Sequence, residues 1–83
     1  MSKEMDFKNR DRFFELGLTI AHYRKLRGMT QEQLAEKAGI SRSQLSIIEA
    51  PNIIQAFSLD IFYNIADALN ISPGVLLDTK LPS

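Results

Sequence analysis

The chain has 83 residues and a formal net charge of zero; 45% of its residues are hydrophobic, 24% are charged, and it contains one histidine and no cysteine. This length supports one hydrophobic core, so we predict a single domain over residues 1–83, with an N-terminal extension at 1–9 and a C-terminal tail at 79–83. The residue counts exclude a disulfide framework and a zinc site built from Cys and His, and we expect no metal and no cofactor.

The first residues, Met1 to Asp6, are charged and lack the apolar stretch of a secretory signal. Nowhere in the chain do about 18 apolar residues follow one another, as a membrane-spanning helix would require. We therefore expect a cytoplasmic protein that does not enter a membrane.

The first predicted helix begins between Asp6 and Asp11 and ends at Gly28, because glycine commonly ends a helix in the left-handed conformation. Gly17 is expected to weaken this helix without preventing it. Apolar residues three or four positions apart form one stripe along it: Phe13, Leu16, Ile20, Tyr23 and Leu26.

A short second helix is predicted over residues 31–38. Thr30 and Gln33 have the spacing of a capping box, in which each side chain accepts a hydrogen bond from a backbone amide at the start of the helix. Gly39 ends the helix and supplies a turn, since glycine takes a positive φ without strain.

A third helix is predicted from Arg42 to about Glu49. Ser41 and Gln44 repeat the capping-box spacing at its start, and Pro51 prevents the helix from continuing. Two short helices joined by a tight glycine-containing turn form a helix-turn-helix, which in DNA-binding proteins places its second helix in the major groove.

Two further helices complete the prediction. Ser58 can cap a fourth helix that ends at Asn70, and Ser72 and Pro73 begin a short fifth one. The predicted fold class is all-α, a compact five-helix domain with the helix-turn-helix at helices 2 and 3. The fourth helix should bury Leu59, Phe62, Ile65, Ala66 and Leu69, and the fifth offers, for packing or a dimer contact, Val75, Leu76 and Leu77.

The net charge of zero argues against a nucleic-acid partner, but the charges are unevenly placed. Residues 1–42 hold nine of the ten basic residues and six acids, whereas residues 43–83 hold Lys80 and four acids. Such a field can orient a protein on DNA, although a short chain can also acquire it by chance.

Three stretches of this chain, within about residues 16–77, carry a resemblance to a known family. The stretches are Leu16-Gly17…Ile20…Tyr23-Arg24, then Thr30-Gln-Glu-Gln-Leu-Ala-Glu-Lys-Ala-Gly-Ile-Ser-Arg-Ser-Gln-Leu-Ser-Ile-Ile-Glu49, then Ser58-Leu-Asp…Ile65-Ala-Asp-Ala-Leu69…Ile71-Ser72…Leu76. They resemble the Cro and phage-repressor type of helix-turn-helix regulators, which implies a repressor-like fold that binds double-stranded DNA.

Helical geometry predicts which side of the third helix is free to contact bases. If Leu45 and Ile48 face the core, the opposite arc contains no acidic residue. An arginine and small polar side chains on that arc can bond base edges, and an isoleucine can contact a thymine methyl group. For the arginine, a phosphate contact or a solvated surface charge is the alternative. The expected base contacts are Arg42, Ser43, Gln44 and Ile47.

The resemblance also implies how the domain is positioned on DNA. Gln31 and its backbone amide should contact a phosphate at the start of the second helix, unless Gln31 is a plain helix-start residue. Arg24 and Glu49 should form an ion pair that leaves the arginine able to meet a phosphate. We also expect phosphate contacts from Ser46 and Asn52. The weaker candidates, expected to be solvated rather than engaged, are Tyr23, Lys25, Arg27 and Lys37.

Residues 50–57 depart from the pattern of the family, whose loop at this place is usually shorter, contains glycine and is often basic. Pro51 lacks an amide to donate, and Asn52 is the obvious polar substitute. The apolar residues either cap the core or form an exposed patch for a partner: Ile53, Ile54 and Phe57.

Sequence-specific binding of double-stranded DNA as a homodimer, with repression favoured over activation, is the first functional hypothesis, because one short helix offers few contacts. The alternative is a protein-interaction module, such as an antitoxin or adaptor, that binds a protein partner through the 50–57 loop. An enzyme is not expected, since one histidine without a cysteine gives no convincing nucleophile–base pair.

Overall fold

The structure, a computed structural model, describes residues 6–53 and 55–78. In this part of the chain a short 3-10 helix, η1, precedes five α-helices and no strand occurs, so the all-α prediction is confirmed there. Ile54, Lys80, the first five residues of the expected extension and the whole expected tail lie outside the described residues. The elements are η1 (Phe7–Asn9), α1 (Arg10–Leu26), α2 (Gln31–Ala38), α3 (Arg42–Glu49), α4 (Leu59–Leu69) and α5 (Pro73–Asp78).

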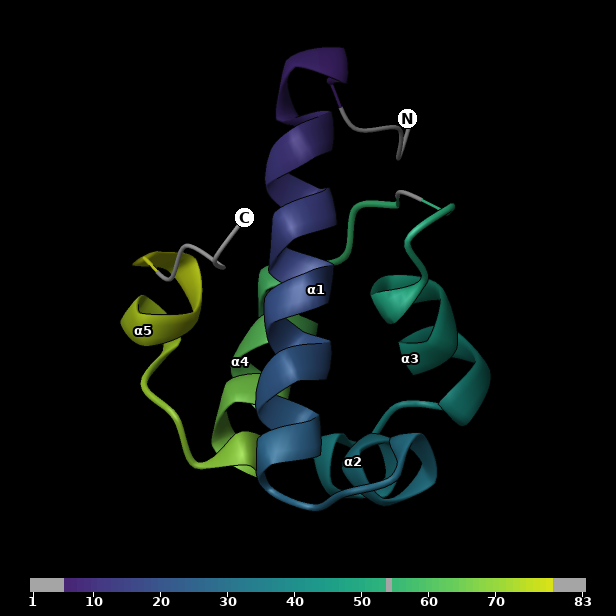
Figure 1. The fold of residues 1–83 in the computed structure, drawn as a ribbon, viewed down its shortest axis with the longest axis vertical. Helices are drawn as coiled ribbons and strands as arrows, with labels where there is room; N and C mark the ends of the chain where they lie inside the picture. The colour runs from purple at the N-terminus through teal and green to yellow at the C-terminus, as the bar shows by residue number, and fades with distance from the viewer. Residues whose placement is uncertain (1–5, 54, 79–83) are drawn as a thin grey trace.

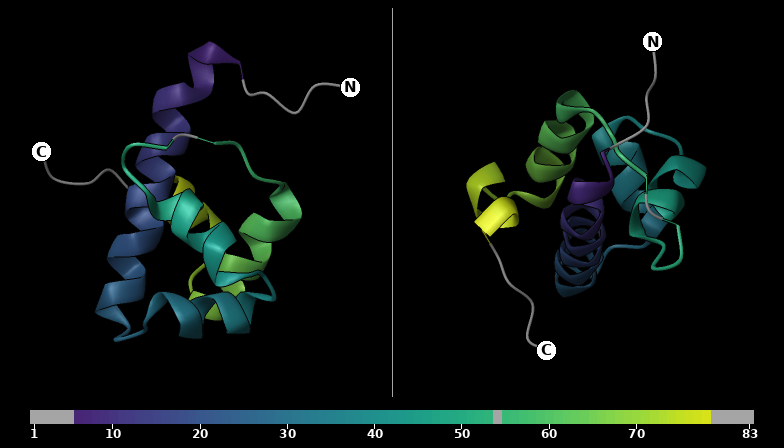
Figure 2. Two further views of the ribbon diagram at one scale, coloured as in Figure 1. Left: turned by 90° about the vertical axis from the view of Figure 1, so that its right-hand side faces the viewer. Right: turned by 90° about the horizontal axis from the view of Figure 1, so that it is seen from above.

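Helix α1 runs along the longest dimension of the molecule and stands between α3 on one side and α5 on the other (Figure 1). Helix α2 lies across the C-terminal end of α1, and α4 lies behind α1 (Figure 1). The views in Figure 2 show the same arrangement from the side of α3 and from above. No helix within residues 6–53 and 55–78 is long and apolar enough to cross a membrane.

The capping predicted at the starts of α2 and α3 is confirmed in full for α2 and in part for α3. Thr30 and Gln33 form a complete capping box. The backbone amide of Gln33 donates to the Thr30 hydroxyl oxygen at 3.1 Å, and the backbone amide of Thr30 donates to the Gln33 side-chain oxygen at 2.9 Å. Gly39 ends α2 at a φ of 75°. Ser41 supplies the hydroxyl part of such a box and accepts from the Gln44 amide at 3.0 Å. These caps satisfy backbone donors that the first turn of a helix would otherwise leave free.

The core consists of two adjoining clusters of buried residues. The larger one joins α1, α2, α3 and α4, and the smaller one attaches α5 to α4. The larger cluster contains Ile20, Leu34, Ala35, Ala38, Leu45, Ile48, Ile65 and Leu69, and the smaller one Phe62, Ala66 and Leu76.

Two apolar residues predicted to face inward are instead exposed. Leu26 keeps 63% of its surface accessible in the last turn of α1, and Leu59 keeps 60% in the first turn of α4. Both have the right helical phase for the core, but each lies in a terminal turn outside the two clusters. Phase indicates direction and does not indicate how far the core extends along a helix.

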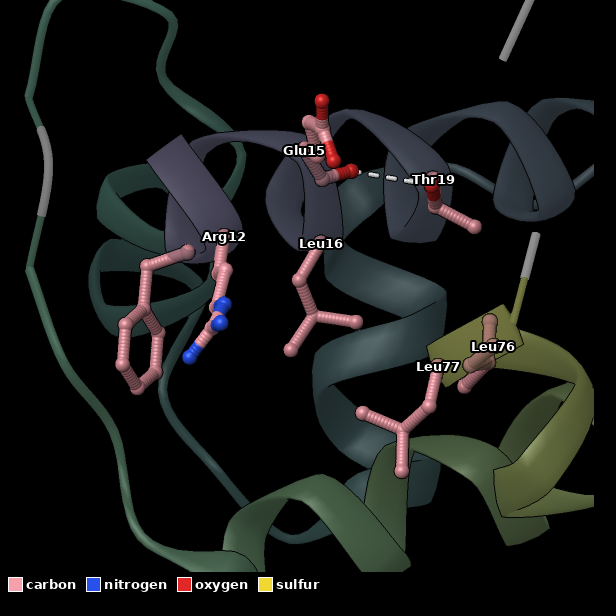
Figure 3. A pocket seen from close by; sticks show the side chains of 7 residues that line it. Arg12, Glu15, Leu16, Thr19, Leu76 and Leu77 are labelled. Carbon is pink, nitrogen blue, oxygen red and sulfur yellow. Dashed lines mark hydrogen bonds between the residues drawn. The ribbon is translucent and has the colours of Figure 1, made fainter. Parts of the chain in front are cut away.

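A groove lies between α1 and α5, on the side of α1 away from α3 (Figure 3). Thr19 is buried there and donates its hydroxyl hydrogen to the Glu15 carbonyl oxygen at 2.9 Å. Leu76 is 1% exposed and packs into the core, whereas Leu77 stays 66% exposed beside the groove. Of the two roles expected for α5, the packing role therefore falls to Leu76.

Candidate nucleic-acid interface

Helix α3 is held to the core by Leu45 and Ile48, which are both buried as predicted. The opposite arc faces outward, with Arg42, Ser43, Gln44 and Ser46 exposed and Ile47 half-buried. The acidic residue of the helix, Glu49, is buried and does not lie on this arc. The outward arc of α3 therefore offers one cation and several neutral hydrogen-bonding groups, which suits the acceptor-rich edges of base pairs.

Arg24 and Glu49 form a forked ion pair between α1 and the last residue of α3. Arg24 Nε donates to Glu49 Oε2 at 2.8 Å, and Arg24 Nη2 donates to Glu49 Oε1 at 3.0 Å. Arg24 Nη1 also donates to the Met29 carbonyl oxygen at 2.7 Å. The two charged side chains are 11% and 4% exposed, so the pair is largely shielded from solvent screening.

Gln31 joins this pair from the first position of α2. Its Nε2 donates to Glu49 Oε1 at 3.0 Å, which links α1, α2 and α3 through one carboxylate. Sequence reasoning placed Gln31 against a phosphate and did not foresee this contact. Gln31 stays half-buried, and an amide nitrogen has a second hydrogen to donate.

A shallow hollow brings the starts of α2 and α3 together. It is lined by Arg24, Thr30, Gln31 and Arg42, and also by Glu32. Three of the predicted DNA-contacting residues therefore share one surface, although they lie far apart in the sequence. The exposed carboxylate of Glu32 adds a negative charge that the sequence prediction left out.

Arg27 is exposed, as expected, but it also makes a contact with α4 that the sequence did not indicate. Its Nε donates at 2.9 Å to the carbonyl oxygen of Leu69, the last residue of α4. The carbonyl groups at the end of a helix have no partner within the helix and carry partial negative charge, which attracts a cation. Lys25 and Lys37 are exposed, as expected, and Tyr23 packs against the core.

The segment after α3 divides between the core and the surface. Phe57 packs edge-to-face on Phe13, with ring centroids 5.5 Å apart, and contacts both core clusters. Ile53 and Asn52 are exposed. Of the two roles considered for the apolar residues of this loop, Phe57 takes the capping one, and Ile53 remains accessible.

Gln55 is a candidate contact that sequence reasoning missed. A hollow between α3 and this loop is lined by Gln44 and Ile47 from the outward arc and by Gln55 from the loop. The signal in the sequence was a second neutral amide in a loop where only Asn52 was considered.

Among residues 6–53 and 55–78, no three His, Asp or Glu side chains gather in a way that could hold a metal ion.

The structure explains why a glycine stands at position 17 of α1, which the sequence did not reveal. It is buried where α1 crosses α3, and a methyl group built on it would overlap the carbonyl oxygen of Ile48. The residue therefore allows a close approach of two helices rather than merely weakening one.

The helix-turn-helix family model matches residues 20–76 of this chain. The HTH-type transcriptional regulator SinR of Bacillus subtilis (strain 168) is 38% identical over 65 residues, which cover 78% of this chain and 58% of SinR. This chain thus spans little more than half the length of that relative.

Solved structures show the same fold. The crystal structure of SinR, the master regulator for biofilm formation, in complex with DNA matches with a TM-score of 0.69 and 38% identity, covering 76% of this chain and 98% of that one. The restriction-modification controller protein C.AhdI from Aeromonas hydrophila matches with a TM-score of 0.71 and 30% identity, covering 77% and 94%. The chain belongs to the helix-turn-helix family, and within it to the Cro and phage-repressor type.

Proposed function

We propose that this chain binds double-stranded DNA in a sequence-specific manner, with α3 in the major groove. The outward arc of α3 carries the proposal, because Arg42, Ser43 and Gln44 are exposed there while Leu45 and Ile48 hold the opposite side to the core. Arginine can bond a guanine through two hydrogen bonds, and serine and glutamine can bond other base edges. Ile47 is assigned to a thymine methyl group.

Phosphate contacts are assigned to two residues that line the hollow, Gln31 and Arg24, and to two neutral side chains outside its lining. The start of α2 presents free backbone amides, which together with the helix dipole favour an anion at Gln31. Arg24 uses three of the five N–H donors of a guanidinium in the contacts described above, which leaves two for a phosphate. The remaining assignments are Ser46 and Asn52.

A homodimer that represses by occupying a promoter is the regulatory form we infer. Helix α3 has eight residues, so a single copy reaches only a few base pairs. Two copies on half-sites one helical turn apart would supply the contacts that a specific site needs. The alternative of a protein-interaction module gains less support, because the aromatic residue of the 50–57 loop, Phe57, packs on Phe13.

The test is a selection of duplexes from a random library with the purified chain, followed by affinity measurements at several salt concentrations. We expect one enriched motif with two related halves and an affinity that falls linearly with salt on logarithmic scales, because cations on phosphates release counterions. Sedimentation of the complex gives its stoichiometry. A library with no enriched motif, together with no salt-dependent binding, would contradict the proposal.

A further inference from the structure

One face of α1 carries four residues spaced by four, three and four positions, which places them in a single line along the helix. We name Phe13, Gly17, Ile20 and Arg24 the α1 stripe. Gly17 and Arg24 contact the last two residues of α3, Phe13 contacts the loop that follows it, and Ile20 belongs to the core cluster that includes Leu45 and Ile48 of α3. Phe13 and Gly17 lie ahead of the residues that the family model matches.

The α1 stripe contacts the last turn of α3 at two levels and the loop that follows α3 at a third. At one end the ring of Phe13 packs on Phe57 in the loop, and at the other end Arg24 pairs with Glu49. Between these contacts Gly17 meets the backbone of Ile48. The last turn of α3 is thus fixed to α1 by the close approach at Gly17 and by the Arg24–Glu49 pair, and the loop that follows α3 is fixed to α1 by Phe13.

The contact at Gly17 leaves no room for a side chain. A Cβ atom there would overlap the Ile48 carbonyl oxygen and lie 3.4 Å from the Ile48 carbonyl carbon and 3.8 Å from the Glu49 Cα. All three neighbours are backbone atoms of α3, so they cannot rotate away as the tip of a side chain could. Any larger residue at position 17 must therefore displace the end of α3 from α1.

Other glycines of the chain lack this constraint. A Cβ at Gly74 would have the Ser72 hydroxyl oxygen as its nearest neighbour, at an ordinary contact distance of 3.7 Å. Gly28 and Gly39 have open space around them and are needed for their positive φ instead. Gly17 is thus set apart by the close approach of α3.

A displacement at the end of α3 is transmitted to its outward arc. The helix has eight residues and behaves as one rigid element, so a tilt at Ile48 changes the direction of Arg42 and Gln44. Hydrogen bonds to base edges tolerate errors of only about 0.5 Å in position. Contacts with phosphates are less demanding, because they depend mainly on charge.

We infer that Gly17 is a positioning residue for α3. Because it has no side chain, α3 can pack closely against α1 in one orientation, and this orientation determines how well the protein distinguishes a cognate from an unrelated duplex. This inference rests on the proposed DNA binding. Gly17 itself would touch no base in the DNA complex, and it would act through the backbone of Ile48 and Glu49.

The experiment compares Gly17→Ala with the matched control Gly74→Ala, well below the melting temperature of each protein. One readout is the amide and arginine Nε–H NMR spectrum of the free proteins. The other is the ratio of affinities for the selected duplex and for a scrambled duplex of the same length. In Gly17→Ala we expect shifts centred on α3 and Arg24, and a ratio about tenfold lower, comparable to losing one good base contact.

The control separates positioning from folding. Gly74→Ala should leave both the α3 signals and the affinity ratio unchanged. Alanine is a better helix former than glycine, so any loss of stability in Gly17→Ala comes from the overlap and not from helix propensity. A loss of folded protein alone lowers both affinities by the same factor and leaves their ratio constant, and that result would overturn the inference.

A second variant covers the case in which Gly17→Ala does not fold. Phe13→Leu removes the ring that packs on Phe57 in the loop after α3, and it adds no atom where α1 crosses α3. The ratio of affinities for the selected and scrambled duplexes should fall, by a smaller factor than in Gly17→Ala. A folded Phe13→Leu protein with the wild-type ratio would overturn the inference. Wild-type protein that prefers no duplex contradicts the proposed function itself, and unshifted α3 signals in Gly17→Ala separately contradict the positioning by Gly17.

Discussion

The two ends of α3 differ in almost every physical respect. At its start Arg42, Ser43 and Gln44 are exposed, and Ser41 caps the backbone. At its end Glu49 and its neighbour Ile48 are buried against α1, and the Glu49 carboxylate receives donors from both α1 and α2. The end of the helix thus carries the contacts that fold the protein, and the start carries groups that are free for a ligand.

This difference indicates that stability and DNA recognition can be changed separately. Removing a side-chain contact at the buried end should mainly lower the free energy of unfolding, and removing a side chain at the exposed start should mainly weaken DNA binding, whereas a displacement of the whole helix, as in Gly17→Ala, should affect recognition too. Single substitutions at each end of α3 test that separation.

Glu49→Ala should cost about 3 kcal/mol of the free energy of unfolding, because Arg24 would be left 11% exposed without its counter-charge. Gln31 would lose its partner as well. Urea unfolding measures the effect. Glu36→Ala, at an exposed position of α2, is the control and should stay within about 0.5 kcal/mol of wild type. Equal effects of the two substitutions would show that the buried end has no special role.

Arg42→Ala should weaken binding to the selected duplex by about 1 to 3 kcal/mol, since a base-bonding arginine contributes on that order. The free energy of unfolding should stay within about 0.5 kcal/mol of wild type, because Arg42 is exposed. Fluorescence anisotropy titration gives the affinity. Arg12→Ala, an exposed arginine on α1, serves as the matched control. If both variants lose the same affinity, Arg42 contributes only general charge.

Ser41→Ala should lower the free energy of unfolding by about 1 kcal/mol, because the amide of Gln44 loses the hydroxyl that caps it. Thermal or urea unfolding detects this change. Ser43→Ala, an exposed helical position, should be neutral or slightly stabilising, since alanine is the better helix former. A neutral Ser41→Ala would indicate that water replaces the cap without cost.

Asn52→Ala should have the smallest effect, a loss of about 0.5 kcal/mol in affinity for selected and scrambled duplexes alike. The reason is that a phosphate contact positions the protein without reading sequence. Parallel titrations with both duplexes measure it, with Asn64→Ala on the exposed side of α4 as the control. A loss restricted to the selected duplex would instead assign Asn52 to a base.

Much of the fold could be predicted because the signals are local. The capping box at Thr30 and the left-handed positions at Gly39 and Asn70 are each specified within a few residues. Leu26 and Leu59 were predicted wrongly, since helical phase does not reveal where the core ends.

The candidate DNA interface could be predicted where it depends on helical phase and could not where it depends on contacts between distant segments. The outward arc of α3 follows from the phase of Leu45 and Ile48, and it could be read from the sequence. The contacts of Gln31 with Glu49, of Arg27 with Leu69 and of Gly17 with Ile48 could not, because they join residues that only the tertiary fold brings together.

We propose that the outward arc of α3 and the start of α2 face the DNA. The most direct test is an NMR titration of the isotope-labelled chain with the selected duplex, which maps the amides that respond. We expect the largest changes at Gln31 and at residues 42–47, with little change in α5. Changes centred on α5 and its groove with α1, with α3 unaffected, would contradict the claim.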